Sequence, residues 1–164
     1  MTYRTVDVDD LSNAPNPTTA KKEVDEALGV ESFGFNVYTV APGERVPWGF
    51  HSHPRHEEVF YVLDGVLTVD TAGDPIVVEA GEALRVPPGH PNCARNAGET
   101  SVRLIAVGAP KVTDEAVIEE RCTSCGNVTD RRSERTDGGE TVILRCADCG
   151  AETDRFGRGP TREE

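Results

Sequence analysis

Three of the four histidines in the chain fall within the six residues from His51 to His56, and two glutamates follow them directly. Residues two positions apart in a β-strand project to the same side, so His51 and His53 would point together. After a turn at Pro54, the next strand would bring Glu58 alongside them. Two imidazoles and one carboxylate with open positions are typical of non-haem Fe(II) sites, and Mn, Ni, Cu or Zn also suit such ligands. The alternative is a solvated loop with incidental histidines.

Four of the five cysteines form two CxxC pairs, Cys122 with Cys125 and Cys146 with Cys149, and a glycine follows each pair. Twenty residues separate the inner cysteines, which is the spacing of a four-cysteine zinc site. The glycines allow tight turns that bring amide groups toward the sulfurs. A segment this small cannot be held together by burial alone, so metal binding would supply its folding energy. The alternative is a redox-active CxxC, or cysteines that hold no metal.

The segment between the cysteine pairs contains a short alternating run, 140–145, preceded by a possible hairpin turn at 137–139. With the cysteines, this pattern resembles a zinc ribbon over residues 121–152. Arg131, Arg132 and Arg135 give the segment a basic edge. We interpret that edge as a protein contact or a solvated turn rather than as a nucleic-acid patch.

The elements that would position the histidines are short strands. Alternating or apolar runs recur between residues 33 and 107, separated by glycine, proline and aspartate turn signals. Strands at this spacing predict a sandwich or a barrel. The runs cover residues 35–41, 58–63, 66–70, 76–79, 83–86 and 102–107.

The regions outside the strand pattern are predicted to contain little regular structure apart from one short helix. Residues 1–29 would form an N-terminal segment with a short helix that starts at Thr18 or Thr19 and is closed by Gly29. Residues 113–120 are predicted as a linker or a short edge segment. Residues 153–164 are rich in charge and glycine, which predicts a disordered tail.

The stretch from Gly43 to Gly65 resembles the first motif of the cupin family: a glycine, then HxH, a glutamate, six residues and a glycine. His51, His53 and Glu58 match the metal-binding positions of that motif. Gly65 matches its terminal turn glycine. The resemblance therefore implies a divalent transition metal held by these three side chains.

Residues 81–89, followed by Asn96, resemble the second cupin motif. Together the motifs imply an all-β fold: a cupin-type double-stranded β-helix, or jelly-roll, barrel over residues 30–112, plus the small C-terminal zinc ribbon. The chain is thus similar to small single-barrel cupins of the conserved-barrel type. A shared fold hosts many functions, so the resemblance does not name a reaction.

The second motif normally supplies a third metal-binding histidine, but Asn92 stands at that position, on the wall expected to face the other ligands. An amide oxygen is a poorer ligand than imidazole for a transition metal. Three interpretations stay open. Asn92 is a weak fourth ligand or a supporting group beside His51, His53 and Glu58; or His90 replaces the lost histidine; or the site has lost its metal and kept only a pocket.

Four other polar residues near the motifs receive simpler interpretations. His56 lies outside the motif and is predicted to be a rim residue rather than a ligand. Arg85 and Arg95 are interpreted as solvated rather than as anion-binding. Cys93 is interpreted as a small buried hydrophobe, because the spacing shows no base to activate its thiol.

The overall composition and charge restrict the partners and the cellular location that can be expected. The chain has 164 residues and a formal net charge of −12, from 29 acidic against 17 basic residues, of which only three are lysines. Such a surface repels phosphate backbones, which argues against a nucleic-acid partner. An acidic, lysine-poor composition is typical of a halophilic cytoplasm, as in halophilic archaea, where salt screens self-repulsion. The sequence shows neither a signal peptide nor a transmembrane run, which predicts a cytoplasmic location and no membrane contact.

Two hypotheses about function follow. The first is a metal-binding cupin that acts on an unidentified small molecule, and the resemblance is compatible with oxygenase, isomerase or lyase chemistry. The second is a non-enzymatic cupin that binds or senses a small ligand and whose ribbon contacts a protein partner. The intact HxH and Glu58 favour the first, whereas Asn92 favours the second. The resemblance also implies a homodimer.

Overall fold

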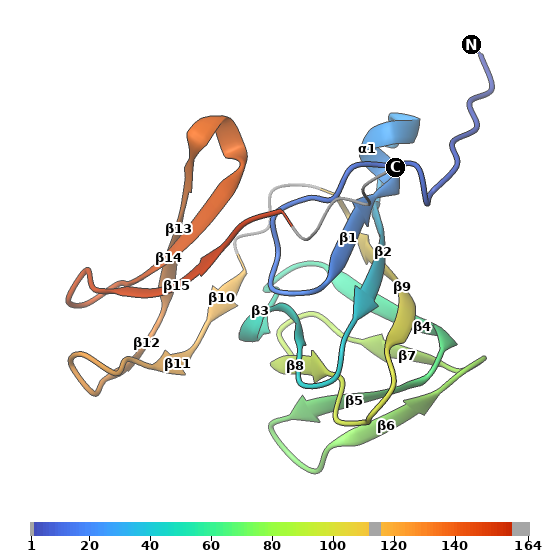
Figure 1. The fold of residues 1–164 in the computed structure, drawn as a ribbon. Coiled ribbons are helices and arrows are strands. Elements are labelled where there is room, and N and C mark those ends of the chain that lie inside the picture. Colours follow the sequence, from blue (N-terminus) through green and yellow to red (C-terminus); the bar gives the residue numbers. More distant parts are fainter. Residues whose placement is uncertain (1, 112–115, 159–164) are drawn as a thin grey trace.

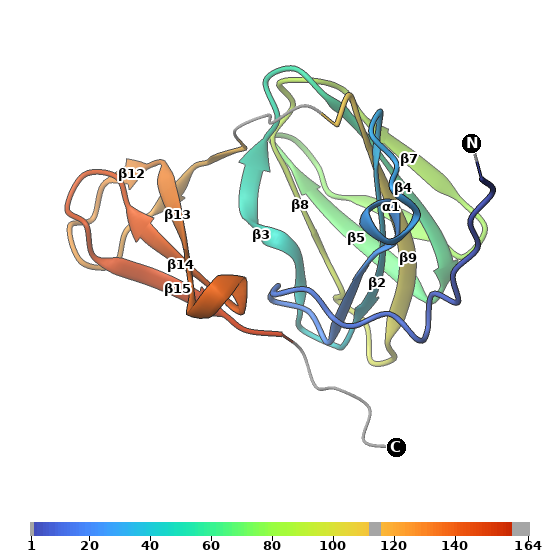
Figure 2. The same cartoon turned by 90° about the horizontal axis from the view of Figure 1, so that it is seen from above.

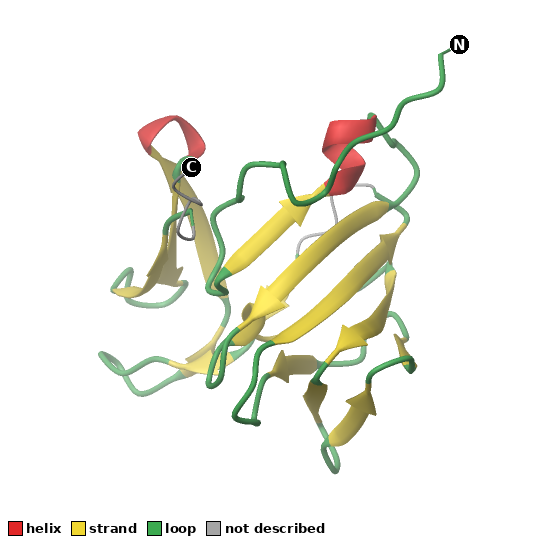
Figure 3. Cartoon of the chain, turned by 45° about the vertical axis from the view of Figure 1, so that its right-hand side comes forward, coloured by secondary structure: helices red, strands yellow, loops and turns green. Residues whose placement is uncertain are grey.

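Alternating apolar residues turn one face of most strands toward a shared interior, and two antiparallel sheets face each other across it (Figure 1). The computed structural model describes residues 2–111 and 116–158. Within these residues almost every element is a strand, and the only helical elements are two short ones (Figure 3). The predicted all-β fold, a barrel with a small C-terminal module, is confirmed.

The first sheet has five strands in the order β1-β2-β9-β4-β7. Its central strands β9 and β4 pair over most of their length, which places Glu58 opposite Gly108. The strands are β1 (Ala20–Glu23), β2 (Gly34–Val40), β9 (Val102–Ala109), β4 (Glu57–Asp64) and β7 (Ala83–Val86).

The second sheet has five strands in the order β10-β3-β8-β5-β6. Strand β3 lies between β8 and β10, so both neighbours flank His51: Asn92 on one side and Ile118 on the other. The strands are β10 (Val117–Ile118), β3 (Arg45–Ser52), β8 (Asn92–Arg95), β5 (Val66–Thr71) and β6 (Ile76–Glu79).

The barrel core lies between the two sheets and comes entirely from residues 38–104. Its members alternate along their strands, as Leu67 and Val69 do along β5. Removing this apolar surface from water is the main favourable term for the barrel. The buried members are Tyr38, Val40, Val46, Phe60, Val62, Leu67, Val69, Val78, Val86, Ala94, Val102 and Leu104.

The predicted N-terminal helix is shorter than expected. Helix α1 covers only Val24–Leu28 and ends at Gly29 in the left-handed conformation, as predicted. Its expected first turn is instead β1, which pairs with β2. The threonine expected to cap the helix has another partner, because the backbone N–H and hydroxyl of Thr19 donate to the carboxylate of Glu44. Sheet pairing has therefore overridden local helix preference.

The C-terminal module, called the ribbon here, comprises residues 120–158. A hairpin of β11 (Glu120–Arg121) and β12 (Val128–Thr129) precedes a three-stranded sheet in the order β13-β14-β15. The predicted turn at 137–139 is present as the 3-10 turn η1 (Asp137–Gly139). The sheet strands are β13 (Arg131–Thr136), β14 (Thr141–Cys146) and β15 (Glu152–Phe156).

Two segments predicted to be irregular contribute strands. The predicted linker, 113–120, contains β10 and the start of β11, although residues 113–115 lie outside the described part. The predicted tail, 153–164, contains most of β15, although 159–164 also lie outside it. Strand β10 is the short edge segment that was the alternative to a linker. The prediction of a disordered tail was wrong for residues 153–156, because they pair with the preceding strand β14.

The ribbon stands beside β3, as Figure 2 shows from above. A small apolar cluster of Ile118, Val142, Leu144 and Phe156 forms its interior, and Trp48 of the barrel packs against that cluster. The N-terminal segment also contacts the ribbon, because the backbone N–H of Asn16 donates to the carbonyl of Gly157. Within the described residues, no helix has the length and apolar character needed to cross a membrane.

A chain that ends after Pro110 should keep a cooperative thermal transition, because every core residue of the barrel precedes it. Its melting temperature should be lower than that of the full chain, since β10 and the packing of Trp48 are lost. Calorimetry of both chains measures this. A truncated chain without any cooperative transition would show that the barrel and the ribbon form one folding unit.

Candidate metal centres

The four ribbon cysteines meet at one point. Their sulfurs all lie within 4.8 Å of one another, and the Cys122–Cys149 and Cys125–Cys146 sulfur pairs are each 3.8 Å apart. This spacing is far too wide for a disulfide. Zinc–sulfur bonds of about 2.3 Å place the corners of a sulfur tetrahedron about 3.8 Å apart. The donor set and its spacing therefore fit one tetrahedral zinc ion.

Each cysteine pair sits on the tight turn that its glycine predicted. The N–H of Gly126 donates to the carbonyl of Cys122, and the N–H of Gly150 donates to that of Cys146. Both glycines have positive φ angles, 79° and 71°, a conformation that side chains with a Cβ rarely adopt. Hydrogen bonds from the backbone N–H groups of Cys125 and Ser124 lower the pKa of Cys122 to about 6. That thiol is thus prepared to bind as a thiolate.

The barrel brings His51, His53 and Glu58 together from two sheets. His51 is on β3 and Glu58 on β4, and the ligand atoms of the three residues lie within 4.8 Å of one another. Nε2 of His51 is 3.7 Å from Oε2 of Glu58, and Nε2 of His53 is 3.6 Å from Oε1. Metal–ligand bonds of about 2.1 Å separate neighbouring donors by about 3.0–3.4 Å. The donors thus stand slightly wider apart than one ion requires.

The ring of His51 is oriented for coordination. Its Nδ1 lies 3.0 Å from the carbonyl oxygen of Gly49, so the neutral ring keeps its proton on Nδ1 and has the Nε2 lone pair free to bind a metal beside Glu58. Nε2 of His51 and Oε2 of Glu58 are buried and make no hydrogen bond. Buried polar atoms without a partner are costly. A bound cation would satisfy both atoms.

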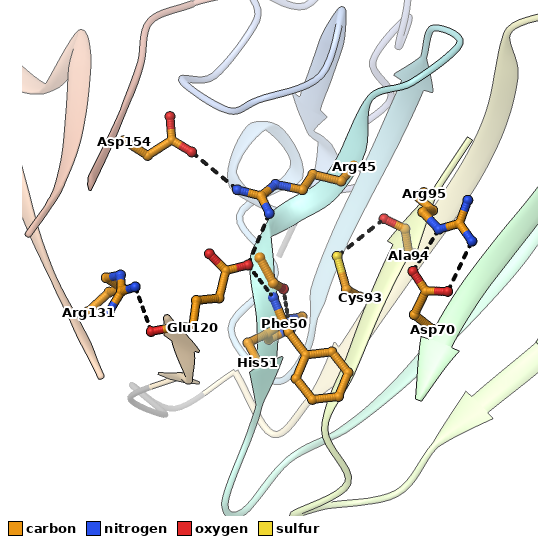
Figure 4. Close-up of polar contacts among 11 residues, drawn as sticks. Arg45, Phe50, His51, Asp70, Cys93, Ala94, Arg95, Glu120, Arg131 and Asp154 are labelled. Carbon is orange, nitrogen blue, oxygen red and sulfur yellow. Dashed lines mark hydrogen bonds and ion pairs between the residues drawn. The ribbon is translucent and has the colours of Figure 1, made fainter. Parts of the chain in front are cut away.

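The ribbon helps to fix this orientation through the backbone at Gly49. Figure 4 shows Glu120 bonded to Arg45 and Phe50. Oε1 of Glu120 accepts the backbone N–H of Phe50 at 3.2 Å and a bond from Arg45 at 3.0 Å. A Cβ at Gly49 would lie 2.6 Å from that same oxygen, and the φ angle there is +150°. Only glycine allows the carboxylate of Glu120 to approach the backbone that holds His51.

Neighbouring charges shift the titration of this site. Burial opposes protonation of His51, but the adjacent Glu58 carboxylate outweighs burial and raises the pKa of His51 above its usual value of 6.5. Burial likewise acts to raise the pKa of Glu58, but His51, His53 and His56 together lower it. The metal-free site therefore favours a carboxylate beside an imidazolium.

Asn92 lies beside His51 and not across the cavity from it. The two residues are paired in register on β8 and β3, within one sheet, whereas Glu58 comes from the opposite sheet. The expectation of a facing wall was wrong because the second motif returns the chain next to β3. Both side-chain amide atoms of Asn92 are buried without a hydrogen bond, and the residue lines the same apolar pocket as His90 and not the cavity beside Glu58.

His90 does not join the cluster. It is exposed, its Nδ1 lies 3.1 Å from the carbonyl of Pro88, and it lines a separate apolar pocket of about 310 Å³ together with Ile76 and Leu84. The hypothesis that His90 replaces the missing histidine therefore has no support. The turn at Pro88 and Gly89 directs the residue away from the barrel interior.

His56 is closer to the site than a rim residue would be. Its ring stacks on His53 with centroids 3.7 Å apart and an interplanar angle of 25°. Its Nε2 is 4.0 Å from Oε1 of Glu58, and its side chain is only 14% exposed. It does not belong to the group of donors that can share one ion. Spacing could not reveal this, because the turn at Pro54 and Arg55 sets the direction of the ring.

The remaining candidate residues have structural partners, some of which Figure 4 shows. Arg95 forms a two-point ion pair with Asp70 at 2.6 and 3.2 Å, and Arg85 pairs with Glu57 at 2.6 Å. Burial raises the pKa of the Cys93 thiol to about 11. These residues do not contribute to the cluster, and Cys93 is the buried small side chain that was predicted.

His53, His56 and Glu58 line a cavity inside the barrel of about 210 Å³. Tyr38 lies in its wall, and burial is the main reason why the pKa of that phenol is raised. Sequence analysis did not identify Tyr38, because it alternates along β2 like any core residue. The cavity offers a metal ion and a small ligand a mostly apolar space.

This geometry agrees with the comparison to known proteins. Residues 36–108 match the family model described as the cupin domain. The barrel therefore has the fold of a cupin domain. A sugar phosphate isomerase of the cupin superfamily from Silicibacter pomeroyi superposes on this chain with a TM-score of 0.63. The superposition covers 92% of each chain at 17% identity, which shows a shared fold.

Two relatives by sequence cover shorter stretches. A germin-like protein, 3-2, of Oryza sativa subsp. japonica is 35% identical over 109 residues, which is 60% of this chain and 49% of that protein. The polyketide synthase CurC of Streptomyces cyaneus is 32% identical over 78 residues, 48% of this chain and 49% of that one. The aligned part of this chain thus spans about half the length of each relative.

Replacing both Cys125 and Cys149 by serine should release one zinc per chain and shift the emission of Trp48 to longer wavelength. The ribbon interior packs against Trp48, the only tryptophan in the chain, and should unfold without its metal. Elemental analysis and fluorescence measure the two effects. The matched control is Cys93→Ser, which should retain the zinc. Freely titrating thiols in untreated wild type would rule out a zinc site here.

Metal affinity of the barrel should rise with pH and level off above the pKa of His51. Coordination requires the neutral imidazole, so uptake by a site whose His51 pKa is raised releases a proton. Loss of one proton corresponds to about a tenfold change in affinity per pH unit below that pKa. Competition between the protein and a chromophoric chelator for Co²⁺, between about pH 6 and pH 8, measures it. An affinity independent of pH in this range would contradict the assignment of His51 as a ligand.

Proposed function

We propose that this protein is a metal-dependent cupin that acts on a small molecule, with His51, His53 and Glu58 as the ligands of a divalent transition metal. The observation that supports this most strongly is the pair of buried, unsatisfied donor atoms on His51 and Glu58 that face each other. Two imidazoles and a carboxylate suit Fe, Mn, Ni, Cu or Zn. Such an ion supplies Lewis acidity or oxygen activation when bound.

The chain's own residues prepare the site in three ways. The carbonyl of Gly49 holds His51 in one tautomer and orientation. The stacked ring of His56 limits how far His53 can rotate. The buried side chains of Tyr38 and Phe60 line the inner cavity and restrict water around Glu58. The reaction class that fits is substrate polarisation in a largely dry cavity, as in oxygenase, isomerase or lyase chemistry.

In this proposal Asn92 supports the metal site and is not one of its three main ligands. Its amide is buried next to His51 and makes no hydrogen bond. We infer that it orients a metal-bound water or substrate oxygen, or serves as a weak ligand through its oxygen. Either role leaves the metal more weakly held than a third imidazole would, because amide oxygen suits transition metals less well.

The ribbon zinc has a separate, structural role in this proposal. Its four thiolate donors leave no open position for a substrate. Since the ribbon has only a small apolar cluster, the ion would supply most of its folding energy. A purely ligand-binding barrel remains the second candidate function, and Asn92 at the position of the missing histidine is the observation that favours it.

The metal content of three variants tests the proposal. His51→Ala should abolish the barrel metal and leave the ribbon zinc in place. Asn92→His should raise the affinity for Co²⁺ or Ni²⁺, because its imidazole would stand in register beside His51. His90→Ala is the matched control, since this exposed histidine lines another pocket. Elemental analysis per chain and chelator competition give the readouts.

A barrel metal content that is unchanged in His51→Ala would show that these residues are not ligands. Wild-type protein that binds no divalent transition metal except the ribbon zinc would favour the ligand-binding function. Melting curves of each variant separate a lost ligand from a lost fold, because the core of the barrel does not include His51 or His90.

A further inference from the structure

A second, larger pocket lies between the barrel and the ribbon. Its volume is about 720 Å³, within the range of small-molecule sites. His51 and His53 lie in its barrel wall, and residues 130–133 of the ribbon form the facing wall. Tyr38, Pro47 and His53 also line the inner cavity. The two spaces therefore adjoin at the candidate ligands.

Positive side chains outnumber negative ones around this pocket, whereas the chain as a whole has a net negative charge. Lys21, Arg131 and Arg132 line it, against one carboxylate, Asp130, so three cations face one anion. Oδ1 of Asp130 accepts the backbone N–H groups of Ile118 and Arg131. The chain carries a net charge of −12. A cationic pocket in so acidic a protein calls for a ligand of negative charge.

The three cationic side chains differ in how many hydrogen bonds and ion pairs they already make within the protein. The guanidinium of Arg131 is buried and donates to the backbone carbonyls of Thr129, Asp130 and Glu120, so it holds the ribbon edge in place. Lys21 is bonded to Glu23 at 2.8 Å. Arg132 is exposed, and its side chain makes no hydrogen bond or ion pair with any residue in the described part of the chain. Arg132 is thus the least engaged of the three cations.

The rest of the lining is apolar or aromatic. Trp48, Pro47, Tyr38 and Ile118 complete the wall. Arginine binds carboxylate and phosphate groups through two parallel hydrogen bonds, which fixes their orientation. Aromatic and aliphatic walls bind the less polar part of a small molecule. The pocket therefore combines an oxyanion anchor with an apolar surface.

We propose that this pocket binds a small organic oxyanion, a carboxylate or a phosphate ester, which Arg132 and Lys21 hold over His51 and His53. The ribbon is then part of the substrate site and not only a folded appendage. The part of this inference that places the substrate next to a metal at His51 and His53 rests on the proposed function. The binding of the anion by Arg132 and Lys21 does not.

Titration of the full chain with inorganic phosphate and, separately, with benzoate tests the inference. Trp48 lines the pocket and is the only tryptophan, so its emission should change as either anion binds. Arg132→Gln should weaken binding about tenfold through loss of a charge-assisted hydrogen-bond pair. Arg132→Lys, which keeps the charge, should recover part of the affinity. A preference for phosphate would indicate a phosphate ester, and one for benzoate a carboxylate with an apolar body.

Arg145→Gln is the matched control. Arg145 is the cross-strand neighbour of Arg132 on the ribbon, but it pairs with Glu134 and does not line the pocket. Its loss should change the affinity by less than about twofold, as for other exposed ion pairs. The ribbon zinc content of each variant verifies the fold. If Arg132→Gln loses zinc, Lys21→Gln on the barrel side takes its place and should likewise weaken binding.

The titrations are done with and without Mn²⁺ added for the barrel. Anion binding that depends on Arg132 but needs no barrel metal supports this inference even if the proposed function fails. Conversely, a barrel that binds Mn²⁺ while Arg132→Gln and Arg145→Gln behave alike would overturn the inference and leave the proposed function standing. A wild type whose Trp48 emission neither anion changes would also overturn it.

Discussion

Strand β3 is the element on which the rest of the site depends, because both of its neighbours act on His51. On one side β8 places Asn92 in register with His51, and on the other β10 places Ile118 there. The carboxylate of Glu120 then bonds to Arg45 and to the backbone of Phe50. A strand that is hydrogen-bonded on both edges holds its side chains in fixed orientations. A metal ligand such as His51 requires a fixed orientation to bind the ion.

This arrangement connects the two candidate metal centres. The ribbon owes its fold to its four thiolates in our proposal, and its residues Glu120 and Asp154 both pair with Arg45 of β3. Each of these ion pairs is partly exposed and contributes little stability by itself. Their geometric effect is larger, since Glu120 occupies the space that a side chain at Gly49 would need. Folding of the ribbon therefore bears on the orientation of His51 through a short chain of contacts.

The sequence was sufficient wherever chemistry depends on local spacing. The HxH alternation and the CxxC pairs predicted which side chains would cluster, because a strand and a tight turn each fix directions within a few residues. It was insufficient for β10 and the placement of Asn92, which depend on pairing with residues far away in the chain. The same limit applies to His56, whose ring direction is set by a turn and by its stacking on His53.

The charge distribution limits how an anion could reach the second pocket. A net charge of −12 repels anions at a distance, whereas the cations of the pocket attract them only within about 8–10 Å at moderate salt. Added salt therefore has two opposing effects, because it screens the long-range repulsion before it weakens the close contact with Arg132. Such a site gains its selectivity from hydrogen bonds and apolar contact at short range, and not from electrostatic steering. This is the behaviour expected of a pocket that two modules form together, with the ligand enclosed between Trp48 and the ribbon edge.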